Sequence, residues 1–535
     1  MIKFEDFSFG FPQKDLYEDI NFEINTGDHA VLIGSNGCGK STLVDLIMHE
    51  DRYTYDGLIR MQKGIRIGYV SQFVESETTE LSVNDFLAAP FRAMLAELDE
   101  IGALMAEDYE KYGDRFQQIM DEIEAVDGYN YESNIGRALA AAGLSEFAER
   151  SVNELSGGEY KLFFILRNML LRPQLLIMDE PDVFLDFENL MALIKLINSY
   201  DGTVLTITHN RVLLSQCFDK VLDIENKSVR EFPGTFAEYN TWMLETKVQL
   251  FEHAKDFDDF IAKQEQIVEK IQVIAEMTAE PKMGKQLKAR ASYIARLRKM
   301  RGDDPFLEEH NHEFNLCFAA DGEAAEPLEI TADNYTIAYD DNCLLENVSF
   351  IAKPGEKVAI VGTNGTGKTS LLRAVYADMK TVYGDEIGFF RQITESDSEL
   401  MLSGGEQNLR QIEELCTVPH RALILDEPTS HLDIYAQIEL EKAIRAYEGT
   451  VLMVSHDLFA VTGCADRIIL IENGTIREMS PRAYRKSIYK NYFTSDIFEA
   501  EKQRIDLEIR ASEYIRRGEY DKARKALGMP EKPEL

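Results

Sequence analysis

The chain has 535 residues, of which 45% are hydrophobic and 28% are charged, so it can form several domains with large cores and is not a disordered tail. Its 94 acidic and 57 basic residues give a net charge of −37 at neutral pH. An evenly acidic surface repels nucleic acid and membrane headgroups, so this balance excludes both as partners unless the charge is unevenly distributed.

No apolar run in the sequence approaches the ~20 residues of a membrane span. The N-terminus lacks the basic and apolar regions of a signal peptide. The six cysteines are scattered and include no CxxC pair, which excludes the usual zinc and disulfide frameworks. We therefore expect a cytoplasmic location and no insertion into a membrane.

The first chemical signal in chain order is a glycine-rich loop between an apolar strand, expected over residues 30–33, and a helix. The loop fits the pattern GxxxxGK[ST] of a phosphate-binding loop, in the strand–loop–helix context that this motif requires. Its backbone N–H groups and the N-terminus of the helix are suited to nucleotide phosphates. We expect a nucleotide to be bound by Gly34, Ser35, Asn36, Gly37, Cys38, Gly39, Lys40, Ser41 and Thr42.

Two later apolar runs, each expected to form a strand, are followed directly by polar side chains. Residues 175–178 are typical of a buried parallel strand, and Asp179 and Glu180 follow at the edge of the sheet where α/β proteins bind ligands. Asp179 is placed to hold Mg²⁺ and Glu180 to deprotonate the attacking water, although a carboxylate at a strand end is more often a helix cap. His209 follows another such run, where it can contact the γ-phosphate and the attacking water. Gln72 is expected to contact Mg²⁺.

The segment of about residues 238–311 is predicted to be a helical hairpin. Apolar residues recur in it at helical spacing, and a segment with Pro and Gly at about 276–284 predicts a short tip. Residues 282–301 hold eight basic and no acidic residues, which in so acidic a chain indicates more than a solvated helix face. These basic residues are Lys282, Lys285, Lys288, Arg290, Arg296, Arg298, Lys299 and Arg301.

Every motif of the first half recurs in the same order after this hairpin, which predicts two homologous domains. The second phosphate loop comprises Gly362, Thr363, Asn364, Gly365, Thr366, Gly367, Lys368, Thr369 and Ser370. The counterparts of the polar residues described above are Gln392, Asp426, Glu427 and His456. The expected ligands of Mg²⁺ in the two copies are Ser41, Gln72, Asp179, Thr369, Gln392 and Asp426. Phe11 and Tyr339 each precede a loop by the same interval, where an aromatic ring can stack on adenine or simply pack in the core.

These motifs together resemble those of ATP-binding cassette ATPases over residues 1–237 and 312–490. The resemblance rests on Leu-Ser-Gly-Gly-Glu, which occurs at 155–159 and again at 402–406, beside the phosphate loop, Gln, Asp-Glu-Pro and His. It implies an α/β fold, ATP hydrolysis, and a monomer in which each Ser-Gly-Gly completes the ATP site of the other cassette. The residues so implied to contact ATP are Ser156, Gly157, Gly158, Ser403, Gly404 and Gly405.

The second copy is shorter than the first. An insert of about residues 73–155, which forms a helical subdomain in cassettes, has only ten residues as its counterpart in the second copy. We therefore expect the second cassette to lack most of this subdomain and the two ATP sites to be unequal, with Lys368, Glu427 and Ser156 forming the better one. Residues 491–535 are predicted to be a helical tail.

Two cassettes, a basic helical hairpin between them and no membrane span resemble the ABC-F proteins. That resemblance implies a ribosome partner, with the hairpin near rRNA, P-site tRNA or the peptidyl-transferase centre, and a role in translation or in antibiotic resistance by ribosome protection. Tyr293 would then stack on a base, or else pack against the first hairpin helix. The alternatives are the cytoplasmic ATPase subunit of an ABC transporter with separate membrane subunits, and a DNA-repair or chromosome ATPase.

Overall fold

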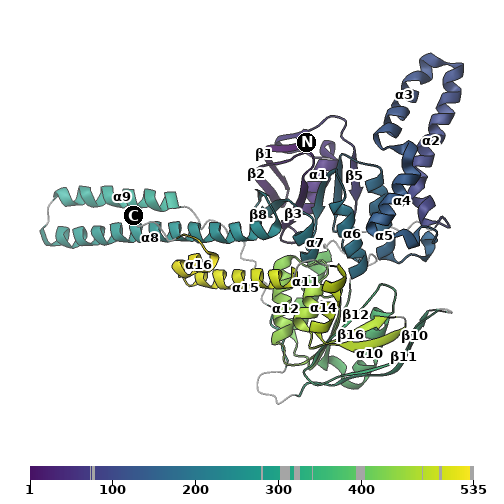
Figure 1. The fold of residues 1–535 in the computed structure, drawn as a ribbon. Helices are drawn as coiled ribbons and strands as arrows, with labels where there is room; N and C mark the ends of the chain where they lie inside the picture. The colour runs from purple at the N-terminus through teal and green to yellow at the C-terminus, as the bar shows by residue number, and fades with distance from the viewer. Residues whose placement is uncertain are drawn as a thin grey trace. The chain divides into compact units, whose positions relative to one another are not determined.

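The computed structural model describes residues 1–72, 74, 79–278, 281–301, 314–318, 326–339, 342–392, 404–472, 474–492 and 497–530. It divides into two units, each of which is described by itself. The first unit joins Met1–Pro233 to His310–Ser495, and the second joins Gly234–Glu309 to Asp496–Leu535. The two motif-bearing copies both lie in the first unit, and we call them the first and second cassette (Figure 1).

Two sheets sharing one apolar core form the strand framework of the first cassette. Its strands are β1 (Ile2–Phe11), β2 (Lys14–Ile24), β3 (His29–Gly34), β4 (Asp56–Met61), β5 (Ile67–Val70), β6 (Leu175–Asp179), β7 (Thr203–Ile207), β8 (Lys220–Glu225) and β9 (Ser228–Pro233). The larger sheet has the order β5-β6-β7-β3-β8-β9 and is parallel except for β9, and β2-β1-β4 form an antiparallel sheet. Every residue of β6 and β7 is buried, as expected for central parallel strands covered on both faces.

The helices of the first cassette include the predicted insert. They are α1 (Lys40–Met48), α2 (Val83–Glu107), α3 (Tyr109–Ala125), α4 (Tyr131–Ala142), α5 (Gly157–Leu170), α6 (Phe187–Asn198) and α7 (Arg211–Gln216). The side chains of Ser82 and Asp108 accept N–H hydrogen bonds that cap α2 and α3, and Gly143 ends α4 in the left-handed conformation. Figure 1 shows α2 and α3 extending away from the sheet.

The second cassette repeats this plan. Its strands are β10 (Ile330–Tyr339), β11 (Asn342–Ala352), β12 (Lys357–Gly362), β13 (Ile387–Phe390), β14 (Ala422–Asp426), β15 (Thr450–Val454), β16 (Arg467–Glu472) and β17 (Thr475–Met479). Its helices are α10 (Lys368–Tyr383), α11 (Gly404–Thr417), α12 (Ile434–Ala446), α13 (Leu458–Cys464) and α14 (Pro481–Tyr492). The order β13-β14-β15-β12-β16-β17 matches that of the first cassette strand for strand, which confirms the predicted α/β fold with two cassettes.

The two cassettes differ most between the strand before the signature and the signature helix. In the first cassette α2, α3 and α4 lie between β5 and α5. In the second, β13 ends at Phe390 and α11 begins at Gly404, and residues 393–403 between them lie outside the described part of the chain. The shortened helical subdomain follows directly, because so short a segment has no room for three helices.

The second unit consists of a long helical hairpin and the C-terminal helices, which pack against it. It contains α8 (Phe236–Thr278), α9 (Pro281–Arg301), α15 (Ile497–Arg516) and α16 (Tyr520–Leu527). The proline expected in the tip occupies the first position of α9, where its missing N–H costs no helical hydrogen bond. Ile261 on α8 packs with Ile294 and Leu297 on α9, which fixes the two hairpin helices against each other. Among the described residues, no helix is long and apolar enough to cross a membrane.

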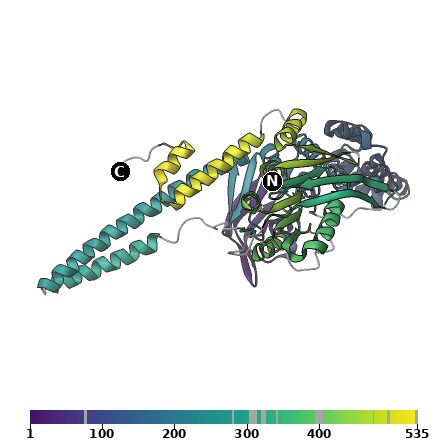
Figure 2. The same cartoon turned by 90° about the horizontal axis from the view of Figure 1, so that it is seen from below.

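The C-terminal helices pack on the base of the hairpin, a contact that the sequence does not reveal. Leu244 and Val248 on α8 form a buried cluster with Ala511 on α15 and with Ala523 and Leu527 on α16. Figures 1 and 2 both show α15 beside α8. Burial of this apolar surface stabilises the base of α8, and Ile261 farther along the helix packs against α9.

We predict that Val248→Ala loosens the base of the hairpin. Val248 is fully buried, so loss of two methyl groups should lower the free energy of local opening of α8 by about 2 kcal/mol. Val273→Ala on the same helix is the control, because this side chain is 47% exposed and its loss should change the opening by less than about 0.5 kcal/mol. Amide hydrogen exchange along α8 measures both, and equal effects of the two variants would contradict the packing.

Candidate functional site

Each phosphate loop is wrapped around the ammonium group of its own lysine. Lys40 Nζ donates to the carbonyl oxygens of Gly34 and Ser35 at 2.8 and 2.9 Å. Lys368 Nζ donates to those of Gly362 and Thr363 at 2.9 and 2.7 Å. Both lysines are buried at the first position of a helix whose N-cap is a left-handed glycine. The loops thus present a buried positive charge together with a helix N-terminus, the combination that phosphate oxygens require.

The two cassettes meet at these loops. Asn36 Nδ2 in the first loop donates to the carbonyl oxygen of His431, and the Asn36 N–H donates to Asp433 Oδ2, at 3.0 and 3.4 Å. Asn364 repeats both contacts in the opposite direction, with the carbonyl of Phe184 at 2.7 Å and Asp186 Oδ2 at 3.0 Å. The cassettes therefore face each other head to tail, and each phosphate loop is held by the loop that follows the Asp-Glu pair of the other cassette.

The signature glycines lie at the same junction. A Cβ atom on Gly158 would be 2.6 Å from the carbonyl of Phe184 and 2.8 Å from Asn364 Nδ2 in the opposite loop. A Cβ on Gly405 would be 2.1 Å from Asn36 Nδ2 and 2.7 Å from the carbonyl of His431. Only glycine permits such close approach. Each signature therefore lies beside the phosphate loop of the other cassette, the pairing that the resemblance implies.

The signature helices α5 and α11 both begin at a glycine, and α5 has a complete cap. Ser156 caps α5 by accepting the Glu159 N–H, while the Glu159 carboxylate accepts the Ser156 N–H, which is a complete capping box. Gly157 and Gly404 are the first residues of α5 and α11. Ser403 lies outside the described residues. We call the group of residues around Lys40 the first site and the group around Lys368 the second site.

The paired carboxylates stand at the carboxyl ends of β6 and β14, as predicted. Glu180 and Glu427 directly follow these strands with positive φ angles of 45° and 51°, a strained backbone for a non-glycine residue. The N–H of each is held by a carbonyl of the neighbouring strand, Ile207 and Val454, at 2.8 and 2.9 Å. The strain occurs in both cassettes, and it turns each glutamate out of the strand toward the pocket.

The environments of the two glutamates differ strongly. Burial favours the neutral form of Glu180, but its hydrogen bond with His431 and the charge of Lys40 outweigh burial and lower its pKa to about 2. Burial raises the pKa of Glu427 well above its usual value, despite the N–H of His456 and the charge of Lys368. A raised pKa makes Glu427 the stronger base of the two.

Hydrogen bonding reinforces this difference. Glu180 Oε2 accepts a bond from Gln72 Nε2 at 2.6 Å and lies 3.1 Å from His431 Nδ1. Glu427 Oε2 accepts the His456 N–H at 3.1 Å, and its Oε1 has no hydrogen bond among the described residues. The second site therefore retains a buried carboxylate oxygen that can accept a proton from water.

The two histidines end β7 and β15 as expected and are buried beside the glutamates. Burial and the charge of Lys40 lower the pKa of His209, and burial and Lys368 lower that of His456 to about 3. Both rings are therefore neutral at physiological pH, and His456 Nε2 lies 3.7 Å from Glu427 Oε1. Gln392 lines the same pocket as these groups.

Four of the six residues predicted to hold Mg²⁺, namely Ser41, Asp179, Thr369 and Asp426, fit a hard cation. Thr369 Oγ1 donates to Asp426 Oδ1 at 3.0 Å, and the buried Asp426 Oδ2 has no hydrogen bond among the described residues. Ser41 makes the corresponding hydrogen bond to Asp179, whose pKa is raised to about 6 by burial and by the charge of Glu180. No group of three or more His, Cys, Asp or Glu residues that could hold a metal occurs in the described part of the chain. One hydroxyl and one carboxylate per site suit Mg²⁺ that also binds phosphate oxygens and water.

Two residues that contact the first site were not predicted from the sequence. His431, in the loop after the second Asp-Glu pair, reaches across to Glu180 and to Gln72 Nε2 at 2.8 Å. Lys161 on α5 donates to the carbonyls of Gln72 and Glu180 at 2.9 and 2.7 Å and holds both in place. The sequence does distinguish these two residues, because each differs from its counterpart in the other copy. His431 corresponds to Phe184, and Lys161 corresponds to Asn408.

The remaining predicted residues lie on the periphery or outside the described side chains. Phe11, at the end of β1, is 47% exposed and meets Phe9 edge to face. The side chain of Tyr339 lies outside the described residues, as do those of Lys282, Lys285 and Arg301. The basic residues of α9 whose side chains are described are Lys288, Arg290, Arg296, Arg298 and Lys299, and Ile294 and Leu297 of the same helix are buried.

We predict that the second site contributes more of the hydrolysis. Glu427→Gln should reduce the ATPase rate of the whole chain at least about tenfold, and Glu180→Gln by less than about threefold, because Glu427 is the stronger base with an available oxygen. Steady-state phosphate release measures both variants. Equal losses would contradict the inequality of the two sites.

The two single variants should also differ in pH dependence. A general base acts in its ionised form, so kcat/KM of Glu180→Gln, which depends on Glu427, should rise with pH through the raised pKa of this glutamate. The kcat/KM of Glu427→Gln, which depends on Glu180 with its pKa of about 2, should be flat between about pH 6 and 9. Parallel profiles for the two variants would show that the difference in environment does not govern catalysis.

Comparison with known proteins supports the geometry. A family model described as "ABC transporter" matches residues 17–183 and 345–399, the phosphate-loop regions of both cassettes. The chain is 27% identical over 512 residues to the energy-dependent translational throttle protein EttA of Haemophilus influenzae, covering 86% of this chain and 89% of the relative.

Two relatives from Bacillus subtilis align over similar lengths. One is the uncharacterized ABC transporter ATP-binding protein YfmM, 25% identical over 85% of this chain and 95% of the relative. The other is the putative ATP-binding protein YdiF, 26% identical over 88% of this chain and 79% of the relative. Together with the two phosphate loops, signatures and Asp-Glu pairs, these matches confirm the resemblance drawn from the motifs. The chain therefore contains regions like ATP-binding cassette domains in both halves, is similar to the translational throttle relative over 86% of its length, and binds and hydrolyses ATP.

Proposed function

We propose that this chain is a ribosome-associated ATPase whose hairpin α8–α9 contacts RNA while the cassettes close on Mg²⁺–ATP and open after hydrolysis. The observation that carries the proposal is the basic face of α9 in a chain with a net charge of −37. The relatives named as translational throttle proteins, which align over 86% of this chain, support the same partner.

The hairpin is the part of the chain suited to RNA. Ile294 and Leu297 face α8 and Arg298 pairs with Glu265 of that helix, whereas Lys288 and Lys299 are exposed on α9. Exposed Lys and Arg on a helix bind phosphates, and RNA helices are recognised largely through their shape and backbone. An acidic body would be repelled by rRNA except here, so the charge distribution itself would orient docking.

The length of the hairpin tip bears on what it contacts. Only two residues separate the end of α8 at Thr278 from the start of α9 at Pro281. A short tip favours contact with P-site tRNA beside the peptidyl-transferase centre over direct displacement of a bound drug. Regulation of translation is therefore the first proposal, and protection of the ribosome from an antibiotic acting at a distance is the second.

The ATP sites provide the cycle that such binding needs. ATP phosphates bound at Lys40 or Lys368 would lie between a phosphate loop and the signature helix of the other cassette, and Ser41, Thr369 and the paired aspartates would share Mg²⁺ with them. Glu180 and Glu427 would then orient and deprotonate the attacking water. Hydrolysis removes the γ-phosphate that both cassettes contact, which favours the open arrangement.

We predict that the Glu180→Gln/Glu427→Gln double variant co-sediments with ribosomes when ATP is present. Loss of both bases should trap the closed state, so the bound fraction should exceed that of the unmodified chain by at least about tenfold. Omission of ATP is the control and should abolish the enrichment. A trapped variant that stays off ribosomes would overturn the proposal and favour an ATPase that serves separate membrane subunits.

Binding should also depend on the charge of the hairpin. Changing Lys288, Arg290, Arg296 and Lys299 to Gln in the trapped double variant should weaken ribosome binding, and it should reduce the slope of log K against log salt by about 0.7 to 0.9 per lost phosphate contact. The matched control changes four exposed basic residues of the same unit to Gln, namely Lys502, Arg510, Arg517 and Lys525. Equal weakening by both sets would show that overall charge, not the hairpin, governs binding.

A further inference from the structure

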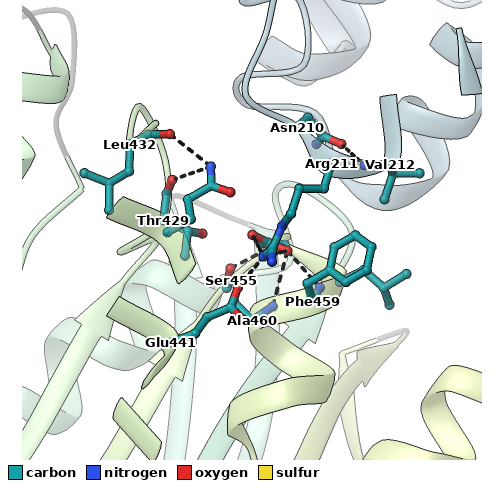
Figure 3. A network of polar contacts seen from close by, with 12 residues as sticks. Asn210, Arg211, Val212, Thr429, Leu432, Glu441, Ser455, Phe459 and Ala460 are labelled. Carbon is teal, nitrogen blue, oxygen red and sulfur yellow. Dashed lines mark hydrogen bonds and ion pairs between the residues drawn. The ribbon is translucent and has the colours of Figure 1, made fainter. Parts of the chain in front are cut away.

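An ion cluster joins residues of the two cassettes (Figure 3). Arg211, the first residue of α7 in the first cassette, is 3% exposed and forms an ion pair with Glu441 on α12 of the second cassette. Its Nη2 also lies 3.2 Å from Asp457 Oδ2, and its guanidinium stacks 4.5 Å from the centre of the Phe459 ring. A buried cation of one cassette is thus neutralised by two carboxylates of the other.

The cluster has no mirror image in the opposite direction. With the repeat offset that aligns His209 with His456, Arg211 corresponds to Leu458 and Glu441 to Ile194. The matching place on the other side of the interface therefore has apolar side chains. The contact is not a requirement of pairing two cassettes, because the other half of the interface forms without it.

The cluster connects directly to the second site. Asp457 follows His456 in the chain and caps α13 by accepting the N–H groups of Phe459 and Ala460 at 2.8 and 3.3 Å. The N–H of His456 donates to Glu427 Oε2 at 3.1 Å. The peptide segment that orients the catalytic carboxylate of the second site is therefore fixed at Asp457 by an arginine from the first cassette.

The first cassette has a different arrangement at the corresponding segment. Asn210 caps α7 with its side chain oxygen and has no charge to pair with a cation. Glu180 instead interacts with His431 of the second cassette. Each catalytic glutamate is thus reached from the opposite cassette, but by different residues and through different contacts.

We propose that Arg211 is a positioning residue that the first cassette supplies to the ATP site of the second cassette. Its ion pairs with Asp457 and Glu441 hold the His456 segment against Glu427 when the cassettes are closed. Separation of the cassettes would break these pairs and release that segment. Hydrolysis at the second site would therefore depend on closure through Arg211, while hydrolysis at the first site would not.

The test introduces Arg211→Met into two backgrounds of the full-length chain. Glu180→Gln leaves the second site to hydrolyse ATP, and Glu427→Gln leaves the first. In the Glu180→Gln background, Arg211→Met should lower kcat at least about tenfold with KM within about twofold, because positioning acts on the transition state. In the Glu427→Gln background, kcat should change by less than about twofold.

Matched variants separate positioning from stability. Arg445→Met removes a second, 52% exposed cation that pairs with Glu441 at 3.2 Å, and it should leave both backgrounds unchanged. Arg211→Met/Glu441→Met removes both buried charges of the main pair while keeping apolar bulk, which typically preserves the fold. In the double variant, the ATPase rate of the first site should be unchanged and that of the second site should remain low. Arg211→Lys keeps the positive charge, so the rate of the second site should be partly recovered relative to Arg211→Met.

Three results would overturn the proposal. They are an equal loss in the two backgrounds, no loss in the Glu180→Gln background, and full recovery of the second site in the double variant. The first and third would show that the cluster stabilises the interface without positioning the site. If Arg211→Met alone fails to fold, the double variant decides the question.

Discussion

The phosphate-loop asparagines carry the contact on which the arrangement of both ATP sites depends. Asn36 and Asn364 each bond to the backbone carbonyl of a residue in the opposite cassette, at 3.0 and 2.7 Å. Since the signature glycines approach the same asparagine side chains too closely for any Cβ atom, loop, signature and opposite loop are fixed as one assembly. Each phosphate loop is contacted by the opposite cassette, so we expect ATP binding and cassette closure to be coupled.

The backbone contacts between the cassettes are symmetric, but the side chains around the two catalytic glutamates differ. Lys161, His431 and Gln72 surround Glu180, whose pKa is about 2, whereas Glu427 is buried with a raised pKa and one oxygen without a hydrogen bond among the described residues. Arg211 adds a contact that reaches only the second site. The inequality therefore arises from electrostatic environment, while the backbone strain at both glutamates is the same.

The sequence predicts the parts that local pattern determines. The repeated motifs predict two α/β cassettes, because a phosphate loop requires a strand before it and a helix after it. They do not predict that α15 and α16 pack on α8, since such packing depends on apolar residues far apart in the chain. His431 and Arg211 were visible only as differences between the copies, and their roles needed the three-dimensional juxtaposition of the cassettes.

The phosphate-loop asparagines hold the two cassettes together, and a distance across the interface measures this most directly. Spin labels at Leu58 and Val382, which are 53% and 72% exposed on the two cassettes, report this distance by double electron–electron resonance. With ATP, the Glu180→Gln/Glu427→Gln chain should show one narrow distance, which Asn36→Ala/Asn364→Ala should broaden and lengthen. A distribution that is unchanged by loss of both asparagines would contradict the account.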